Sequence, residues 1–135
     1  MVYQLPVKSK KLKVSNRYLS YVVFRSAGDV LINQRSQKGI WAGLFEFPGI
    51  EGKEPQSLTE VKNHFNLVPE SKINEVTTII HKLTHLRLEI KVYSLDQIPS
   101  SLKEEKYQLH KVKELHNFAF PKPLKSLIES KTLFK

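Results

Sequence analysis

The strongest constraint on the fold is a strict alternation of apolar and polar residues between positions 86 and 92. The apolar set is Leu86, Leu88, Ile90 and Val92, and the polar set between them is Arg87, Glu89 and Lys91. A period of two places the apolar side chains on one face, so it predicts a strand that is buried on one side only. Residues 77–83 are its expected partner strand, with the connection near residues 83–85.

Further strands are predicted on both sides of this pair. The turn signal Ser26-Ala27-Gly28-Asp29 lies between two segments rich in aromatic and β-branched residues and predicts a hairpin. A short apolar strand is expected to end at Pro48-Gly49, and the polar residues 50–56 are expected to form a loop. The expected strands cover residues 17–24, 30–36, 41–47 and 106–112.

Two segments have the spacing of a helix face. Residues 57–66 carry apolar side chains at positions 58, 61 and 65, and Ser57 with Glu60 predicts a capping box. Residues 121–134 open with two prolines and continue with three apolar residues at helical spacing, Leu124, Leu127 and Ile128. This order of elements predicts an α+β fold of the α/β sandwich type, with a mixed β-sheet packed between helices.

Positive charge dominates the composition. The chain of 135 residues has 22 Lys and Arg against 13 Asp and Glu, a net charge of +9. An acid-free run before Asp29 contains the candidate phosphate contacts, Lys8, Lys10, Lys11 and Lys13. Such a run favours a basic arm that lies on DNA, although a domain with solvated lysines is the alternative. We therefore expect residues 1–15 to be a basic linker and residues 16–135 to form one domain.

Several classes of site are excluded. The chain has no cysteine, so these residues hold no disulfide, thiolate metal site, iron–sulfur cluster or cysteine nucleophile. His81 and His85 have HxxxH spacing, but four extended residues span about 13 Å, so we expect no metal site there. No segment approaches the ~20 apolar residues of a membrane span, and no secretory signal is recognisable, which favours a cytoplasmic location.

Residues 41–65, WAGLFEFPGIEGKEPQSLTEVKNHF, have the layout of a Nudix segment: a Trp, a strand ending in Pro-Gly, a loop and a helix. A Nudix hydrolase needs clustered glutamates on that helix, because Mg²⁺ and a diphosphate require several carboxylate oxygens. The aligned positions here read Lys62, Asn63, His64, Phe65 and Asn66, and Glu54 alone can occupy the first acidic position. The sequence therefore predicts a Nudix-like fold without Nudix catalysis.

Three ordered blocks make the resemblance more specific. GIWAGLFEFPGIE, HKLTHLRLEIKVY and FAFPKPLKSLI resemble the C-terminal domain of the adenine DNA glycosylases, the MutY family. The resemblance covers nearly the whole chain, including LPVKSKK, which is similar to the family's interdomain connector. It implies a non-catalytic DNA-binding domain that recognises 8-oxoguanine opposite a mispaired adenine.

The resemblance also implies what lies outside this chain. The glycosylase active site and an iron–sulfur cluster belong to an N-terminal catalytic domain, and no cofactor or metal is expected in residues 1–135. The implied partners are duplex DNA with an 8-oxoguanine:adenine mispair and that N-terminal domain of the same polypeptide. The implied protein is a monomer that is cytoplasmic and associated with a bacterial nucleoid.

The family reads the lesion with a loop between two strands, and that position is Leu83-Thr84-His85 here. Oxidation turns guanine N7 from an acceptor into an N–H donor, so an acceptor near N7 prefers the lesion. The Thr84 hydroxyl can accept this bond, His85 is a second candidate contact, and Leu83 replaces the family's aromatic residue as an apolar wedge. Tyr18 and Tyr21 can stack on bases, although strand tyrosines usually pack.

Two alternatives stay open. An active Nudix hydrolase of nucleoside diphosphate-linked substrates would need the helical carboxylates that are replaced here. A degenerate Nudix module that binds only proteins is disfavoured by the charge of +9 and by the Leu83-Thr84-His85 block.

Overall fold

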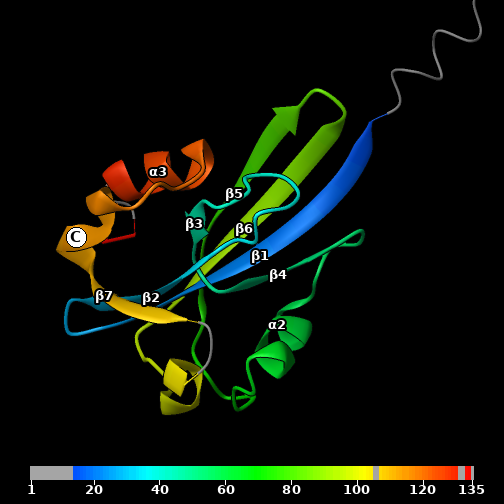
Figure 1. Cartoon of the computed structure of the whole chain (residues 1–135). Coiled ribbons are helices and arrows are strands. Elements are labelled where there is room, and N and C mark those ends of the chain that lie inside the picture. Colours follow the sequence, from blue (N-terminus) through cyan, green and yellow to red (C-terminus); the bar gives the residue numbers. More distant parts are fainter. Residues whose placement is uncertain (1–13, 105–106, 131–132, 135) are drawn as a thin grey trace, which may run out of the picture.

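The computed structural model describes residues 14–104, 107–130 and 133–134, in which one mixed sheet lies between helices (Figure 1). Its strands are β1 (Ser15–Ser26), β2 (Asp29–Gln34), β3 (Phe45–Glu46), β4 (Gly49–Gly52), β5 (Asn74–Leu83), β6 (Leu86–Leu95) and β7 (Gln108–Lys111). Its α-helices are α2 (Leu58–His64) and α3 (Lys122–Glu129), with 3-10 helices at Ser100–Glu104 and Val112–Asn117. The α+β class and the mixed sheet are confirmed.

The long strand β1 organises the sheet. The strand order is β3-β2-β1-β6-β5, with β4 paired to β1 and β7 paired to β2. Strand β1 runs parallel to β6 over ten paired positions, from Ser15 with Leu86 to Phe24 with Leu95. The β5–β6 pair is antiparallel and ends with Leu83 opposite Leu86. The start of β1 therefore lies beside the tip of the β5–β6 hairpin.

Each face of the sheet has its own core. The alternation in β6 works as predicted: Leu88, Ile90 and Val92 are fully buried against α3, whose Leu124 and Leu127 pack on them. The opposite face buries Val61 and Phe65, at α2 and its C-cap, on residues of β1, β2 and β6. The two apolar faces thus fix the helices on opposite sides of the sheet.

Local signals set several elements. The capping box forms as predicted, with the Ser57 hydroxyl accepting from the Glu60 N–H at 3.1 Å and the Glu60 carboxylate accepting from the Ser57 N–H at 2.8 Å. The Ala27-Gly28 turn of the β1–β2 hairpin has positive φ at both residues, 51° and 82°. Two positive values identify a type I′ turn, whose twist suits a two-residue hairpin.

Four predictions about elements were wrong in part. The strand expected over residues 41–47 is limited to Phe45–Glu46, because residues 40–43 form a turn. Residues 49–52 form strand β4 rather than the start of a loop, because their backbone pairs with β1. The side chain of Leu58 is not on the buried face of α2, since 39% of the residue is exposed. Helix α3 ends at Glu129, short of the predicted residue 134.

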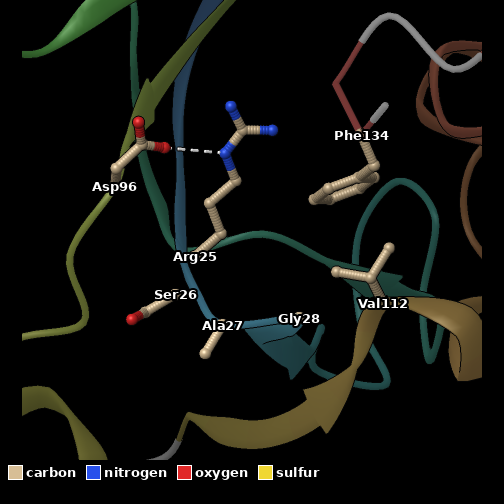
Figure 2. A pocket seen from close by; sticks show the side chains of 7 residues that line it. All are labelled: Arg25, Ser26, Ala27, Gly28, Asp96, Val112 and Phe134. Carbon is tan, nitrogen blue, oxygen red and sulfur yellow. Dashed lines mark hydrogen bonds and ion pairs between the residues drawn. The ribbon is translucent and has the colours of Figure 1, made fainter.

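The last described residues return to the far end of β1. Leu133 is buried in the core on the α3 side of the sheet. Its carbonyl accepts a hydrogen bond from Arg25. The guanidinium of Arg25 lies 5.9 Å from the centre of the Phe134 ring, and Figure 2 shows both side chains. Arg25 also forms an ion pair of 2.9 Å with Asp96 after β6. One arginine thereby joins β1, the end of β6 and the C-terminal residues.

Candidate functional site

The predicted reading loop is the turn between β5 and β6. Leu83 and Leu86 pair across the hairpin, so Thr84 and His85 are the two loop residues. Neither has a positive φ, so this turn is not of the primed types that two-residue hairpins favour. The N–H of Ser15 donates to the His85 carbonyl at 3.1 Å. This hydrogen bond ties the loop to the first residue of β1 and fixes its position.

The three predicted residues differ in their surroundings. Leu83 is partly buried and packs on the core, so its side chain supports the hairpin in this structure and does not project as a wedge. Thr84 and His85 are exposed. Neither side chain forms a hydrogen bond or ion pair with another described residue, so both polar groups face solvent with their bonding capacity available.

The predicted basic arm enters the fold at this loop. Val14 is 50% exposed and directly precedes Ser15, which is anchored to His85. The candidate phosphate contacts Lys8, Lys10, Lys11 and Lys13 lie outside the described residues. Their order in the chain connects them to β1 at the same end of the sheet as Thr84 and His85.

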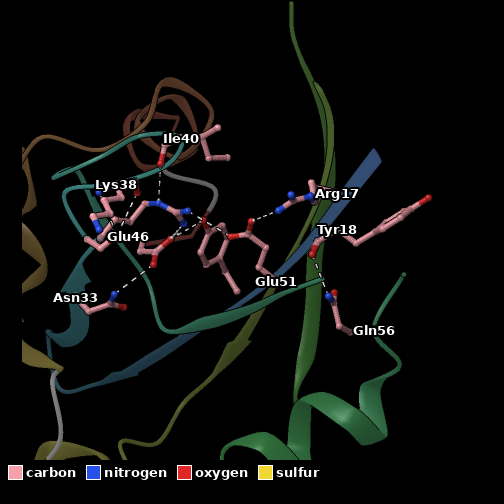
Figure 3. Close-up of polar contacts among 11 residues, drawn as sticks. Arg17, Tyr18, Asn33, Lys38, Ile40, Glu46, Glu51 and Gln56 are labelled. Atoms are coloured by element: carbon pink, nitrogen blue, oxygen red, sulfur yellow. Dashed lines mark hydrogen bonds and ion pairs between the residues drawn. The ribbon is translucent and has the colours of Figure 1, made fainter. Parts of the chain in front are cut away.

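A polar cluster lies deeper in the sheet, around the carboxylate of Glu46 (Figure 3). Arg35 donates to it at 2.7 Å, the Tyr21 hydroxyl at 2.8 Å and the Asn33 side chain at 3.2 Å. Glu51 extends the cluster by accepting from Arg35 at 3.3 Å and from Arg17 at 3.1 Å. The Asn33 Oδ1 atom is the one buried side-chain polar atom left without a partner in the described part of the chain.

The surroundings of this cluster raise the pKa of two side chains, Tyr21 and Arg35. Burial raises the pKa of Tyr21 well above its ordinary value, and the nearby Glu46 carboxylate raises it further. Burial alone would lower the pKa of Arg35, but the Glu46 charge and hydrogen bond outweigh that effect, so the Arg35 pKa is raised. Tyr21 is thus held neutral and Arg35 charged, so both keep the protons that they donate to Glu46.

The helix of the Nudix-like segment carries one carboxylate. Glu60 of α2 lies in a groove with Glu51, Glu54, Asn63 and His64. Glu60 is engaged by its capping box and Glu51 by two arginines. Within residues 14–104, 107–130 and 133–134, no group of three or more His, Cys, Asp or Glu side chains is placed to hold a metal ion.

The aromatic residues of the Nudix-like segment, His81 and the two tyrosines of β1 are described by their burial and ring contacts. Trp41 and Phe45 pack against the core, and Phe47 is fully buried. The His81 ring lies 6.0 Å from the Trp41 ring, on β5, two residues from the hairpin end. Tyr21 is buried, whereas Tyr18 is partly exposed.

The role of Glu46 is apparent only in the structure. The structure makes it the centre of the polar cluster, with hydrogen-bond donors from two strands: Tyr21 on β1, Asn33 on β2 and Arg35 just after β2. No local pattern signals this, because the partners are brought together only by sheet pairing.

Comparisons with known proteins agree with this architecture. A family model for the NUDIX domain matches residues 20–130. The MutT protein from Methanosarcina mazei Go1 shares the fold with a TM-score of 0.67 and 18% identity, over 88% of this chain and 94% of that one. A MutT NUDIX hydrolase from Burkholderia pseudomallei has a TM-score of 0.63 and 13% identity, over 85% and 97%. At these identities the likeness concerns the fold alone.

The curated relatives that match this chain are adenine DNA glycosylases. The chain is 25% identical over 127 residues to the adenine DNA glycosylase of Buchnera aphidicola, covering 92% of this chain and 36% of that protein. It is 28% identical over 113 residues to the adenine DNA glycosylase of Mus musculus, covering 74% and 22%. The chain thus spans about a third or less of these relatives.

Where the structure describes the chain, it has no helix long and apolar enough to cross a membrane. The match over residues 20–130, the shared fold and the similarity to part of the adenine DNA glycosylases all agree with the resemblance found in the sequence. The chain is similar to part of the adenine DNA glycosylases, and it belongs to the NUDIX domain family.

Proposed function

We propose that this chain is the lesion-recognition domain of an adenine DNA glycosylase and that its β5–β6 hairpin reads 8-oxoguanine opposite the mispaired adenine. The observation that carries this proposal is the exposure of Thr84 and His85 at a hairpin tip that Ser15 anchors. A fixed backbone with free polar side chains suits recognition, because little ordering is needed on binding.

The chemistry of Thr84 matches the lesion. The N7–H of 8-oxoguanine is a donor, and the Thr84 hydroxyl can accept from it without losing a bond inside the protein. Ordinary guanine has an acceptor at N7, so the hydroxyl would have to donate instead. His85 stands beside it and can contact a phosphate, which adds affinity without sequence information.

The proposed division of labour leaves glycosidic chemistry to the N-terminal catalytic domain, with its iron–sulfur cluster. This chain contributes DNA binding and base selection. The engaged carboxylates near α2 support a domain that does not hydrolyse nucleotides, since a Nudix hydrolase needs several free carboxylates for Mg²⁺.

The test joins this domain to its catalytic half and measures binding to duplexes with 8-oxoguanine or guanine opposite a non-cleavable adenine analogue. Thr84→Val keeps the shape and removes the hydroxyl. We expect it to lower the preference for the oxidised base by about 0.5–1.5 kcal/mol, the net value of one hydrogen bond. Affinity for the guanine duplex should change little.

Two companion variants sharpen this test at fixed salt. His85→Ala should weaken both duplexes together if His85 contacts phosphate. Leu83→Phe restores an aromatic side chain at a partly buried position, so it tests whether an aromatic group there improves lesion binding. Equal losses on both duplexes for Thr84→Val would show that the hairpin does not read the lesion.

A further inference from the structure

One half of the sheet has a face that no helix of the described residues covers. On the α2 side, α2 packs over the far halves of β1 and β6, where Val22, Phe24, Tyr93 and Leu95 are buried. Toward the hairpin end the same face continues into polar residues that are partly or fully exposed, except for Ser20, which is buried and donates to the Gln56 side chain at 2.8 Å. In Figure 1 this end of β1, β5 and β6 reaches well beyond α2.

Strand register defines the residues of this open sheet face. Paired residues on neighbouring strands point to the same side. Tyr18, Glu89 and Ile80 form a central row, flanked by the rows Asn16, Arg87, Lys82 and Ser20, Lys91, Thr78. The intervening residues of β6 point the other way into the core, which fixes the orientation of all three rows.

The open sheet face is basic. Lys82, Arg87 and Lys91 stand on it with one carboxylate, Glu89, which forms a long ion pair of 3.8 Å with Arg87. Lys82 and Lys91 have no carboxylate within 4 Å among the described residues, so their charges are not neutralised within the fold. Arg87 and Lys91 are four residues apart on β6, about 13 Å. That distance matches roughly four nucleotides of duplex rise.

Its central row presents one aromatic and one apolar side chain, on either side of Glu89. Ile80 is 44% exposed, a large fraction for an isoleucine in a ten-residue strand. Tyr18 is held through its backbone, whose carbonyl accepts from the Gln56 side chain at 2.9 Å. Figure 3 shows its ring directed away from the Glu46 cluster. A sheet face with cations near an aromatic ring is suited to a sugar-phosphate strand.

We propose that the open sheet face is a second DNA-binding surface, which holds the sugar-phosphate backbone of the duplex beside the β5–β6 hairpin. It rests on the proposed function only in taking DNA as the occupant. The position supports this occupant, because Lys82 is two residues before Thr84 and Arg87 two residues after His85. A strand engaged by the hairpin would thus continue over this face, where its phosphates meet unneutralised cations.

Undamaged duplex DNA and this chain are sufficient for the test. The double variant Lys82→Gln, Lys91→Gln removes two charges and leaves the Arg87–Glu89 pair in place. We expect the slope of log affinity against log salt to fall by roughly 1.8, since each lost phosphate contact removes about 0.9. Near 0.1 M salt, affinity should fall by at least an order of magnitude.

A matched control is available at the opposite end of the sheet. Lys72→Gln, Lys113→Gln makes the same change in net charge at two exposed lysines away from the hairpin. We expect this control to change the slope by much less. Equal effects of the two double variants would overturn the proposal, because binding would then follow total charge and not this face.

Glu89→Gln should change the affinity for DNA in the opposite direction. Removing the single carboxylate of the open sheet face should strengthen binding to undamaged DNA, which damage to the fold cannot mimic. Unchanged or weaker binding would count against the proposal. The preference for 8-oxoguanine should stay the same in all these variants, whereas Thr84→Val changes it. A failure of lesion reading and a failure of this surface are therefore seen in different measurements.

Discussion

The Glu46 cluster and the β5–β6 hairpin use the same kinds of side chain in opposite ways. Around Glu46, hydroxyl, amide and guanidinium groups are directed inward, and one carboxylate receives three of them. At the hairpin, a hydroxyl and an imidazole point outward without a partner in the described chain. Polar groups that are satisfied inside the fold stabilise it, whereas exposed groups on a fixed backbone are available to a ligand.

Removal of the Glu46 carboxylate should have the largest effect on stability. Glu46→Ala leaves Arg35, whose side chain is 14% exposed, as a mostly buried charge without its main partner. We expect the free energy of unfolding to fall by about 3–5 kcal/mol. Glu46→Gln keeps an acceptor and should cost less. Urea denaturation measures both, and lesion preference in the surviving folded fraction should not change.

The ionisation of Tyr21 should produce a smaller, pH-dependent effect. Its pKa in the folded state is raised above the value near 10 of the unfolded chain. The unfolded state therefore loses this proton first, and the free energy of unfolding should fall as the pH rises above about 10. Tyr21→Phe should remove this dependence and cost about 1 kcal/mol at neutral pH through the lost hydrogen bond. An unchanged alkaline slope would contradict the assignment.

Replacing the two loop residues of the β5–β6 hairpin should have the smallest effect on stability and a clear effect on lesion recognition. Thr84→Asn with His85→Gly gives the hairpin the Asn-Gly sequence that favours a type I′ turn. We expect stability to stay equal or to rise by about 0.5 kcal/mol. Lesion preference should be lost with both side chains. Thermal unfolding and the two-duplex binding assay together would show whether Thr84 and His85 serve lesion recognition at the expense of turn stability.

Elements set by local chemistry could be predicted from the sequence. The alternation in β6, the capping box of α2 and the Ala27-Gly28 turn all depend on residues close in the chain. The parallel pairing of β1 with β6 could not be read in this way, because the two strands are separated by some sixty residues of other structure. It is this pairing that brings Ser15 to the hairpin.

Strand β4 shows why a tertiary contact can hide an element. Gly49 resembles a loop glycine in the sequence, yet a Cβ at this position would lie 2.6 Å from the Ser20 carbonyl oxygen and 2.7 Å from the Tyr21 ring. The glycine is needed for close approach of β4 to β1, not for a turn. Similarly, the position of the candidate hairpin could be predicted, but its anchoring and the packing of Leu83 required the structure.

The contact of Arg25 with the C-terminal residues has a consequence for the order of folding. The β5–β6 hairpin closes locally and can form within microseconds. The core on the α3 side, however, requires Leu133 to reach a strand that begins at residue 15. Closing so long a loop is slow, so this core should form after the local hairpin. A chain that stops before Leu133 should therefore remain open to proteases.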